Sequence, residues 1–502
     1  MAMVQQLPDD NHFVDVKPVN KKENRQQGSA LYAKRVKIHP RRVKGLFRQL
    51  KWYIMAGSLT VYYLAPWIRW DRGPDAPNQA ILIDFPARRF YFFFIEIWPH
   101  ELYYIAGLLI MAGIGLFLTA SIVGRAWCGY FCPQTVWVDL FLVVERWVEG
   151  DRNKRIRLDR APWSLEKMFK RAAKHSIWLL IALLTGGAWV FYFADAPKFA
   201  VELVTLHAPF VAYATVGVMT LTTYVFGGLM REQVCTYMCP WPRVQGAMVD
   251  EDTMTITYRG WRGEPRAPIR TKRSAPLPEG APEPGDCIDC NHCVVVCPMG
   301  IDIRDGQQLE CISCGLCIDA CNTMMAKVGR PANLIAYDTY RRDKLKAEKS
   351  EVQETHLIRP RTLVYIGLWC LVGIAMLFAL ATRSTIEVNV LRDRNPLYVQ
   401  LSDGSIRNGF TLKVRNMLPR EREMILSVRG LGNSGILMPD AKETDIVVPI
   451  TIKADSVLSQ HFFVVAGEVG AKISAKEFTF RLMDSGDGKI IETDAIFRGP
   501  AK

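Results

Sequence analysis

The sequence predicts a multi-domain membrane protein with an α-helical bundle of about five transmembrane helices, a ferredoxin insert of the bacterial two-cluster type, and a C-terminal all-β sandwich of immunoglobulin-like architecture. Three observations predict it. Apolar stretches long enough to cross a bilayer recur before residue 383, closely spaced cysteines fill 287–321, and period-two alternation runs through 383–502. The chain has 502 residues, which is enough for several domains.

The composition excludes an ordinary soluble enzyme and a pure membrane bundle. Hydrophobic residues make up 49% of the chain and charged residues 23%. A net charge of +13 would suit nucleic-acid binding if it formed a basic face on a soluble fold. The basic residues cluster beside the apolar stretches instead, which indicates orientation in a bilayer. We therefore expect the membrane, and no nucleic acid, as a partner.

A transmembrane helix needs about twenty mostly apolar residues. The stretches that meet this requirement are 52–68, 102–123, 176–194, 209–230 and 362–382. The aromatic run at 89–104 is interrupted by Glu96 and Pro99, so it suits an interfacial segment that leads into the second span.

The distribution of Lys and Arg in short flanks predicts the orientation of the spans. The N-terminal arm is basic, the segment 124–175 holds eleven Lys and Arg residues, and 195–208 holds one. We therefore expect the N-terminus, 124–175 and 231–361 on the cytoplasmic side and 383–502 on the outer side. The N-terminus is polar and lacks the early apolar core of a cleavable signal.

These features set the expected domain boundaries. In chain order they are a basic arm at 1–45, the bundle of the first four spans at 46–259, a proline-rich linker at 260–286, the ferredoxin unit at 287–330, a connector at 331–361, the fifth span at 362–382 and the sandwich at 383–502. Six prolines in "RGEPRAPIRTKRSAPLPEGAPEPGD" predict an extended tether that gives the ferredoxin unit some reach.

The most specific motif is a pair of cysteine runs. "CIDCNHCVVVCPMG" begins at 287 and "CISCGLCIDACNT" at 311, and both have the spacing C-x2-C-x2-C-x3-C. In ferredoxins with this spacing, three thiolates bind one 4Fe-4S cluster and the fourth cysteine binds the other. The pattern predicts one cluster on Cys287, Cys290, Cys293 and Cys321, and a second on Cys311, Cys314, Cys317 and Cys297.

Paired zinc ribbons also use C-x2-C, but their ligand patterns do not repeat four cysteines in this spacing. Asn322 stands where a second proline would follow, and we expect it to change the local turn and not the ligands. His292 lies inside the first run, where it would hydrogen-bond a sulfur or face water.

Two further cysteine pairs share the motif C-x-Y-x-C-P, each directly after a span: Cys128 and Cys132, and Cys235 and Cys239. Side chains four residues apart lie on one helix face, and the following proline predicts a junction between helices. If the span pairs pack together, four thiolates could converge on Cu(I), zinc or an iron–sulfur group. The alternative is that these are buried structural cysteines.

Two other features of the sequence allow predictions. His100 and His207 lie near the outer ends of spans, where they would either ligate a haem or serve a structural role. Segments such as "NGFTLKVRNML" and "KEFTFRLMD" predict about seven strands in the C-terminal sandwich. It contains no cluster of catalytic groups, which favours a binding or docking module.

The chain resembles the cytochrome c oxidase accessory proteins called CcoG, FixG or RdxA over nearly its whole length. The features that carry the resemblance are the order of the spans, the segments "CGYFCPQTVW" and "CTYMCPWPRVQ", the double ferredoxin motif and the C-terminal sandwich. The resemblance implies a multi-pass protein of the bacterial inner membrane, with a cytoplasmic ferredoxin domain and a periplasmic sandwich. It also implies two 4Fe-4S clusters on the eight cysteines of the double motif. Asn322 is the departure from the family pattern.

The resemblance further implies a cupric reductase that makes Cu(I) for the assembly of cbb3-type cytochrome c oxidase. Its partners would be oxidase assembly factors and a copper chaperone or a copper-exporting ATPase. Cys128, Cys132, Cys235 and Cys239 would be the catalytic, copper-binding residues, with copper as the substrate. No glycine-rich dinucleotide motif is visible, so the electron donor is open.

Two other functions stay open on the sequence. One is a quinol-linked electron-transfer subunit similar to NapH, with a quinone near Trp98, His100 and Glu101. The other is a non-enzymatic assembly scaffold, in which the clusters are structural and the outer domain grips the oxidase.

Overall fold

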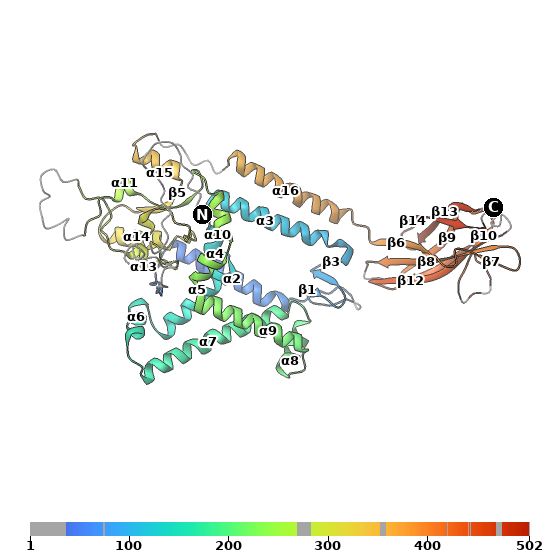
Figure 1. The fold of residues 1–502 in the computed structure, drawn as a ribbon, viewed down its shortest axis with the longest axis horizontal. Helices are drawn as coiled ribbons and strands as arrows, with labels where there is room; N and C mark the ends of the chain where they lie inside the picture. The colour runs from blue at the N-terminus through green and yellow to red at the C-terminus, as the bar shows by residue number, and fades with distance from the viewer. Residues whose placement is uncertain are drawn as a thin grey trace, which may run out of the picture. The chain divides into compact units, whose positions relative to one another are not determined.

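A computed structural model describes residues 37–73, 76–268, 283–351, 358–418, 420–439, 441, 443–467 and 474–500. Most of the N-terminal arm, 269–282 of the linker and 352–357 of the connector lie outside the described residues. The chain forms two compact units (Figure 1). The first holds the cysteine motifs and the candidate membrane helices as far as Met376. The second holds 69–79 and the chain from Leu377 onward, which includes the end of the fifth candidate span and the strands that follow it.

Five helical segments of the described chain are long and apolar enough to cross a membrane: Pro99–Val123, Ala126–Val148, Leu165–Val190, Phe210–Met230 and Pro360–Ala381. Their helices are α3 (Tyr103–Val123), α4 (Ala126–Tyr130), α5 (Pro133–Val148), α7 (Leu165–Val190), α9 (Phe210–Thr223), the π-helical η3 (Tyr224–Met230) and α16 (Pro360–Ala381). Four segments coincide with the expected spans at 102–123, 176–194, 209–230 and 362–382.

The remaining segment differs from the sequence prediction. Ala126–Val148 lies in the stretch that the Lys and Arg count assigned to a cytoplasmic loop. Asp139, Glu145 and Arg146 interrupt its apolar run in the sequence. In the structure Asp139 and Glu145 are buried against neighbouring helices, so the charges face protein. A search for spans that tolerates charged residues buried against neighbouring helices would have identified this segment.

The expected first span at 52–68 lies in α2 (Leu46–Leu64) and the short η1 (Ala65–Trp67). α2 is not among the five apolar helices, and Arg48 and Lys51 fall within it. In a soluble protein a helix buries its apolar side chains and exposes its charged ones, and α2 does the reverse at several positions. Arg48 and Lys51 are buried, whereas Tyr53 and Val61 are exposed. A helix of this kind suits lipid on one face and a polar protein interior on the other.

The aromatic run at 89–104 is mostly strand. β1 (Ile81–Asp84), β2 (Arg89–Phe92) and β3 (Ile95–Ile97) form an antiparallel sheet in that order, and η2 (Pro99–Glu101) leads into α3. The carboxylate of Glu101 accepts a hydrogen bond of 3.0 Å from the backbone N–H of Trp98, which caps the start of the helical segment.

The ferredoxin unit is larger than the cysteine runs. β4 (Thr255–Tyr258) pairs antiparallel with β5 (Ile335–Asp338), and these strands enclose α13 (His292–Val296), η5 (Ile303–Asp305) and α14 (Leu316–Lys327). β4 falls within the expected membrane bundle at 46–259 and β5 within the expected connector at 331–361, so both boundaries of the ferredoxin unit differ from the prediction. Four residues of alternating pattern are too few to identify a strand without its partner. Smaller helices surround the unit: α10 (Trp241–Met248), α11 (Gly260–Gly263) and α15 (Tyr340–Ala347).

The ends of the proline-rich linker are bonded to each other. Arg262 forms an ion pair of 2.7 Å with Asp286, and the backbone N–H of Asp286 donates to the carbonyl of Arg262 at 2.8 Å. Gly285 N–H donates to the carbonyl of Pro265 at 3.0 Å. The expectation of a tether that gives the ferredoxin unit reach is therefore wrong, because both ends are anchored in the same unit.

The second unit is a sandwich of two sheets. Its strands are β6 (Ile386–Arg392), β7 (Val399–Gln400), β8 (Ile406–Asn416), β9 (Arg422–Arg429), β10 (Ser434–Leu437), β11 (Val447–Ile452), β12 (Ser456–Ala466), β13 (Ala475–Asp484) and β14 (Ile490–Arg498). One sheet has the order β10-β12-β8-β6, with β7 also paired to β8, and the other has β11-β9-β13-β14. The expected strands are all present, and the two short strands β7 and β10 were missed.

Aromatic side chains fill the space between the two sheets. Phe410, Phe462 and Phe480 have no exposed surface and contact one another, mainly edge to face. The side-chain amide of the buried Asn408 donates to the backbone carbonyl of Arg498 at 2.7 Å and accepts from its backbone N–H at 2.9 Å, which ties β8 to β14 across the sandwich.

Candidate functional site

Two cavities in the first unit are lined by cysteines. The first is lined by Cys287, Cys290, Cys293 and Cys321, with Ile288, Met325 and Leu334 among its apolar neighbours. Asp289 and Asn291 have left-handed backbone conformations, and Asn291 starts α13. These two turns bend the chain so that three successive cysteines face one space, and α14 supplies the fourth.

The second cavity is lined by Cys297, Cys311, Cys314 and Cys317, and Cys293 also reaches its wall. Cys297 ends α13, so the fourth cysteine of the first run lies with the first three of the second. Ser313 and Gly315 are left-handed, and Gly315 starts α14. The structure therefore brings together the members of each set that the spacing predicts.

The thiols of both cavities are chemically suited to an iron–sulfur cluster. Burial, with repulsion from neighbouring thiols, raises the pKa of Cys293, Cys297 and Cys321 to about 12 and that of Cys311 to about 11. Thiolates form there only if a cationic group enters. Backbone N–H groups of Met299 and Ile301 point at the Cys297 sulfur and favour its charged form.

The cavities do not suit a single metal ion. Among the described residues, no three His, Cys, Asp or Glu side chains lie close enough to share one ion. In a cubane each thiolate binds a different iron atom, so its ligands are spread around a larger group. The sulfur ligands and the apolar walls of both cavities fit such a group.

Two residues within the motifs have roles that spacing does not reveal. Asn322 does not end its helix as Pro298 does after Cys297, because α14 continues to Lys327. Its side-chain oxygen accepts a hydrogen bond of 2.7 Å from the backbone N–H of Asn333, just before β5. The Nε2 atom of His292 lies 3.1 Å from the guanidinium of Arg41, so this ring pairs with the N-terminal segment.

Both C-x-Y-x-C-P pairs lie at junctions, as their prolines predict. Cys128 belongs to the short α4, and Cys132 immediately precedes Pro133 at the start of α5. Cys235 lies in the π-helical η4 (Val234–Met238), and Cys239 ends it before Pro240. The exposure of the four thiols is graded, with Cys128 buried, Cys132 and Cys235 partly buried and Cys239 exposed.

The structure brings these four cysteines into one neighbourhood. Burial first, and then the nearby Cys132 and Cys128, raise the pKa of the Cys235 thiol to about 12. Cys128 and Cys235 belong to the same apolar cluster as Cys297 and Cys314 of the second cavity. The two pairs therefore lie directly beside that cavity.

Contacts of the first pair hold it against the second cavity. A Cβ atom on Gly129 would lie 2.5 Å from the carbonyl oxygen of Ile312, so only glycine permits this approach. The Tyr130 hydroxyl donates to the carbonyl of Cys314 at 3.0 Å, and the Cys128 thiol donates to Gln245 at 3.2 Å. The roles of Gly129, Tyr130 and Gln245 were not predicted from the sequence, although Gly129 and Tyr130 lie within the first C-x-Y-x-C-P motif.

The geometry gives little support to a haem on His100 and His207 or to a quinone near Trp98, His100 and Glu101. His100 and His207 are both exposed, at the start of α3 and before α9. Trp98 and Glu101 are buried, and the hydrogen bond between them caps a helical start. This arrangement gives Trp98 and Glu101 a structural role.

Comparison with known proteins identifies the family. Residues 230–340 match the family model of the 4Fe-4S dicluster domain, 105–154 that of a 4Fe-4S binding domain, and 376–500 that of the IG-like fold at the C-terminal of FixG. The chain is 58% identical to nitrogen fixation protein FixG of Rhizobium meliloti over 426 residues, or 80% of each chain. The chain belongs to the FixG/RdxA family.

Two further members of the FixG/RdxA family come from Cereibacter sphaeroides. Protein RdxB is 52% identical, over 94% of this chain and 98% of its own, and protein RdxA is 50% identical, over 93% and 98%. With the five candidate spans, the family and its 4Fe-4S domains make this chain a multi-pass membrane iron–sulfur protein of electron transfer. The match at 105–154 includes Cys128 and Cys132 and no other cysteine.

Proposed function

We propose that this chain is a cupric reductase, which converts Cu(II) to Cu(I) at the thiols of Cys128, Cys132, Cys235 and Cys239. The observation that carries the proposal is the packing of both C-x-Y-x-C-P pairs against the second cysteine cavity. A redox-inactive structural role for the pairs would need no such neighbour. Soft thiolates bind Cu(I) in preference to Cu(II), so the site favours the product of one-electron reduction.

The electron path requires iron–sulfur clusters in both cysteine cavities. Cys287, Cys290, Cys293 and Cys321 would hold one 4Fe-4S cluster, and Cys297, Cys311, Cys314 and Cys317 the other. When bound, these clusters supply one-electron transfer. The buried Cys128 lies at the cavity end of the copper site, and the exposed Cys239 lies where copper can enter from solution.

The place of the reaction in the cell follows from the family resemblance and from the charge of the flanks. The cysteine-bearing ends would face the cytoplasm and the sandwich the periplasm. The Cu(I) product would pass to a copper chaperone or a copper-exporting ATPase, for maturation of cbb3-type cytochrome c oxidase. The sandwich would dock oxidase assembly factors.

The test uses anaerobically purified protein reduced with dithionite and freed of excess reductant. Cu(II) is added with a Cu(I)-specific chelator while cluster absorbance is followed. We expect cluster reoxidation in proportion to Cu(I) formed, and a loss of that rate in Cys235→Ala and Cys239→Ala with unchanged iron content. Cys370→Ala is the matched control, because Cys370 is an exposed cysteine of α16 outside the motifs. Clusters that stay reduced in the presence of Cu(II) would end the reductase proposal.

A second candidate for the four thiols is a third iron–sulfur cluster. The observation that favours it is the match of 105–154 to a 4Fe-4S binding domain. Iron analysis separates the two: two clusters give about eight iron atoms per chain, and three give about twelve. If Cys132→Ala lowers the iron content by about four atoms, the pairs hold a cluster.

A further inference from the structure

A cavity of about 390 Å³ lies between the first described segment of the chain, α6 and the ferredoxin unit. Its volume falls within the range of cavities that receive ligands. The cations that line it are Lys37, Arg152 and Arg160, and the ferredoxin unit contributes Val294, Val295 and Gly300. The cavity therefore places positive charge against the unit that carries the cysteine runs.

The basic segment 37–44 is held between α6 and α13. Lys37 forms an ion pair of 2.8 Å with Asp159 of α6. The backbone N–H of Arg41 donates to the carbonyl of Val295 in α13 at 2.9 Å. Because the segment is bonded to both helices, its charges have a fixed place beside the ferredoxin unit.

The surface around this cavity is strongly positive. Segment 37–44 and α6 contain nine Lys and Arg residues and one acidic residue, Asp159. Arg155 is buried and pairs with Glu145, whereas the other eight cations are exposed or partly exposed. Within the described part of the chain, Arg152 and Arg160 form no ion pair and no side-chain hydrogen bond. We call this surface the basic face, made by Lys37, Arg41, Arg42, Lys44, Arg152, Lys154, Arg157 and Arg160, and such a surface attracts an anionic partner.

The basic face meets the first cysteine cavity at α13. Val294 of this helix lines the basic cavity and also packs against the apolar cluster that contains Cys293. The guanidinium of Arg41 lies 3.1 Å from Nε2 of His292, which lines the first cysteine cavity together with the exposed Cys290. A partner on the basic face would therefore lie about one helix diameter, roughly 10 Å, from the first cysteine cavity.

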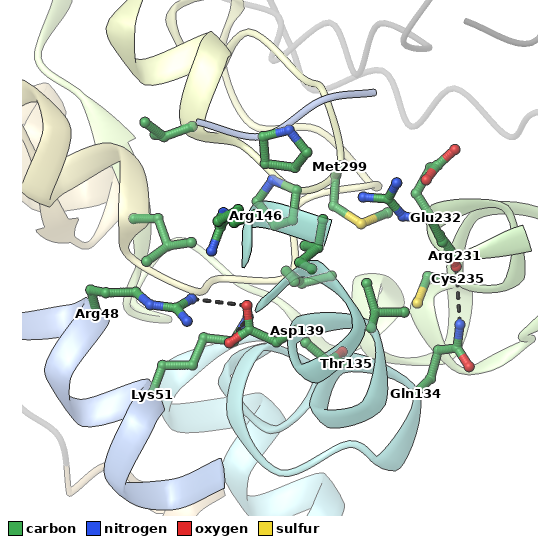
Figure 2. A pocket seen from close by; sticks show the side chains of 17 residues that line it. Arg48, Lys51, Gln134, Thr135, Asp139, Arg146, Arg231, Glu232, Cys235 and Met299 are labelled. Carbon is green, nitrogen blue, oxygen red and sulfur yellow. Dashed lines mark hydrogen bonds and ion pairs between the residues drawn. The ribbon is translucent and has the colours of Figure 1, made fainter. Parts of the chain in front are cut away.

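A second approach to the cysteine cavities has no room for a partner. The space between α2, α5 and the loop after Cys297 has a volume of about 30 Å³, enough for one or two water molecules. Figure 2 shows how side chains close it: Arg48 of α2 is bonded to Asp139 of α5 at 2.9 Å, and Lys51 lies beside them. Of the two approaches, the basic face is the one that can receive a partner.

We propose that the basic face docks an acidic one-electron carrier protein of the ferredoxin class, which supplies electrons to the cupric reductase. The proposal rests on the proposed function for its electron acceptor. One electron passes from the reduced carrier to the first cysteine cavity, and one Cu(II) is reduced to Cu(I) for each carrier oxidised, with no bond formed or broken in the carrier. Carboxylates of the carrier would enter the cavity beside Arg152 and Arg160. A carrier protein fits better than an anionic lipid, because α13 belongs to the ferredoxin unit and to no candidate span.

Binding is measured first, without copper, by titrating the purified holoprotein in detergent with an oxidised plant-type 2Fe-2S ferredoxin in a calorimeter. We expect saturable binding that weakens as salt is raised and that falls about tenfold when Arg152→Gln and Arg160→Gln are combined. Lys344→Glu is the matched control, because it changes the net charge by the same amount and Lys344 is exposed on α15, outside the basic face. Absent binding to the wild type, or equal binding by the double variant, would overturn the proposal.

Electron transfer is measured next, again without copper, by mixing the reduced ferredoxin with the oxidised holoprotein and following cluster reduction by freeze-quench EPR. We expect the double variant to lose about nine-tenths of the rate at limiting ferredoxin, while dithionite still reduces its clusters completely. Equal rates in the double variant and the wild type would contradict a docking site.

Two further outcomes separate the proposal from its alternatives. If the double variant loses bound phosphatidylglycerol in native mass spectrometry and keeps the ferredoxin-driven rate, the basic face binds lipid and the proposal is overturned. If dithionite-reduced wild type fails to reduce Cu(II), the reductase proposal fails, and the copper-free measurements still decide whether the carrier docks.

Discussion

At the residue scale, Gly129 sets how closely the first cysteine pair approaches the second cavity. Its Cα faces the carbonyl of Ile312 and the backbone of Cys314. We expect Gly129→Ala to push the cysteine loop away, and to lower both iron content and the rate of Cu(I) formation severalfold. Gly113→Ala is the control, since nothing lies within 4 Å of a Cβ there. Normal iron content and copper reduction in Gly129→Ala would contradict the close approach.

His39 gives the stability of the first unit a dependence on pH. Burial, with the positive charges of Arg155 and Lys37, lowers the pKa of His39 from 6.5 to about 4. Between these values the unfolded chain takes up a proton that the folded chain does not, so stability rises with pH from about 4 to about 6.5.

The measurement is the thermal unfolding midpoint of the detergent-solubilised protein at pH 5 and pH 7.5. We expect His39→Gln to reduce the difference between the two midpoints. The exposed His207 provides the control, and His207→Gln should leave the difference at its wild-type value. An undiminished difference in His39→Gln would show that other groups cause the pH dependence.

The cysteines could be grouped from spacing alone, because the double run has a geometry that chain connectivity imposes. Gly129, Tyr130 and Gln245 could not be found in the same way. Their roles arise from contacts between segments more than one hundred residues apart, such as Tyr130 with Cys314 and Cys128 with Gln245. The ion pair of Arg48 with Asp139 was missed for the same reason, because these two residues lie 91 positions apart in the sequence.

At the scale of elements, an ion network joins α5, α6 (Arg152–Arg160) and α7. The buried carboxylate of Glu149 lies 2.8 Å from Arg171 and 2.9 Å from Lys174. Glu149→Gln would leave Lys174 buried beside a neutral partner, and loss of one member of a buried pair costs about 3–5 kcal/mol. We expect a clearly lowered unfolding midpoint in detergent.

The matched control for this network is Glu166→Gln. Glu166 pairs with Lys170 on the exposed surface of α7, where an ion pair contributes little because water screens it. A midpoint for Glu149→Gln as high as that of Glu166→Gln would show that the network is not part of the folding energy.

Helices and strands were predicted well where the sequence has a strong hydrophobic periodicity. They were predicted poorly where they depend on contact with another strand or helix. The strands from β6 onward alternate clearly, and only the short β7 and β10 were missed. β4 and β5 are four residues each, and each is a strand because it pairs with the other, which lies about eighty residues away in the sequence. The apolar segment at 126–148, which consists of α4 and α5, was hidden by charges that the folded bundle covers.

At the scale of the whole molecule, all residues that line the two cysteine cavities belong to the first unit. We expect a chain that ends after Thr385 to retain its iron and its rate of dithionite-driven copper reduction. Iron analysis and the chelator assay on membrane-inserted protein would measure both. A loss of iron on removal of the sandwich would show that the second unit supports the cluster sites.

The contacts at the base of the proline-rich linker hold its two ends, at Arg262 and Asp286, together. Because Arg262 is bonded to Asp286 and Pro265 to Gly285, the positions of β4 and of the first cysteine run do not depend on the number of residues between Pro265 and Gly285. Natural variation in length should therefore be tolerated here more readily than elsewhere in the ferredoxin unit. The same property marks a place where a fluorescent reporter can be spliced into the protein while its electron path stays intact.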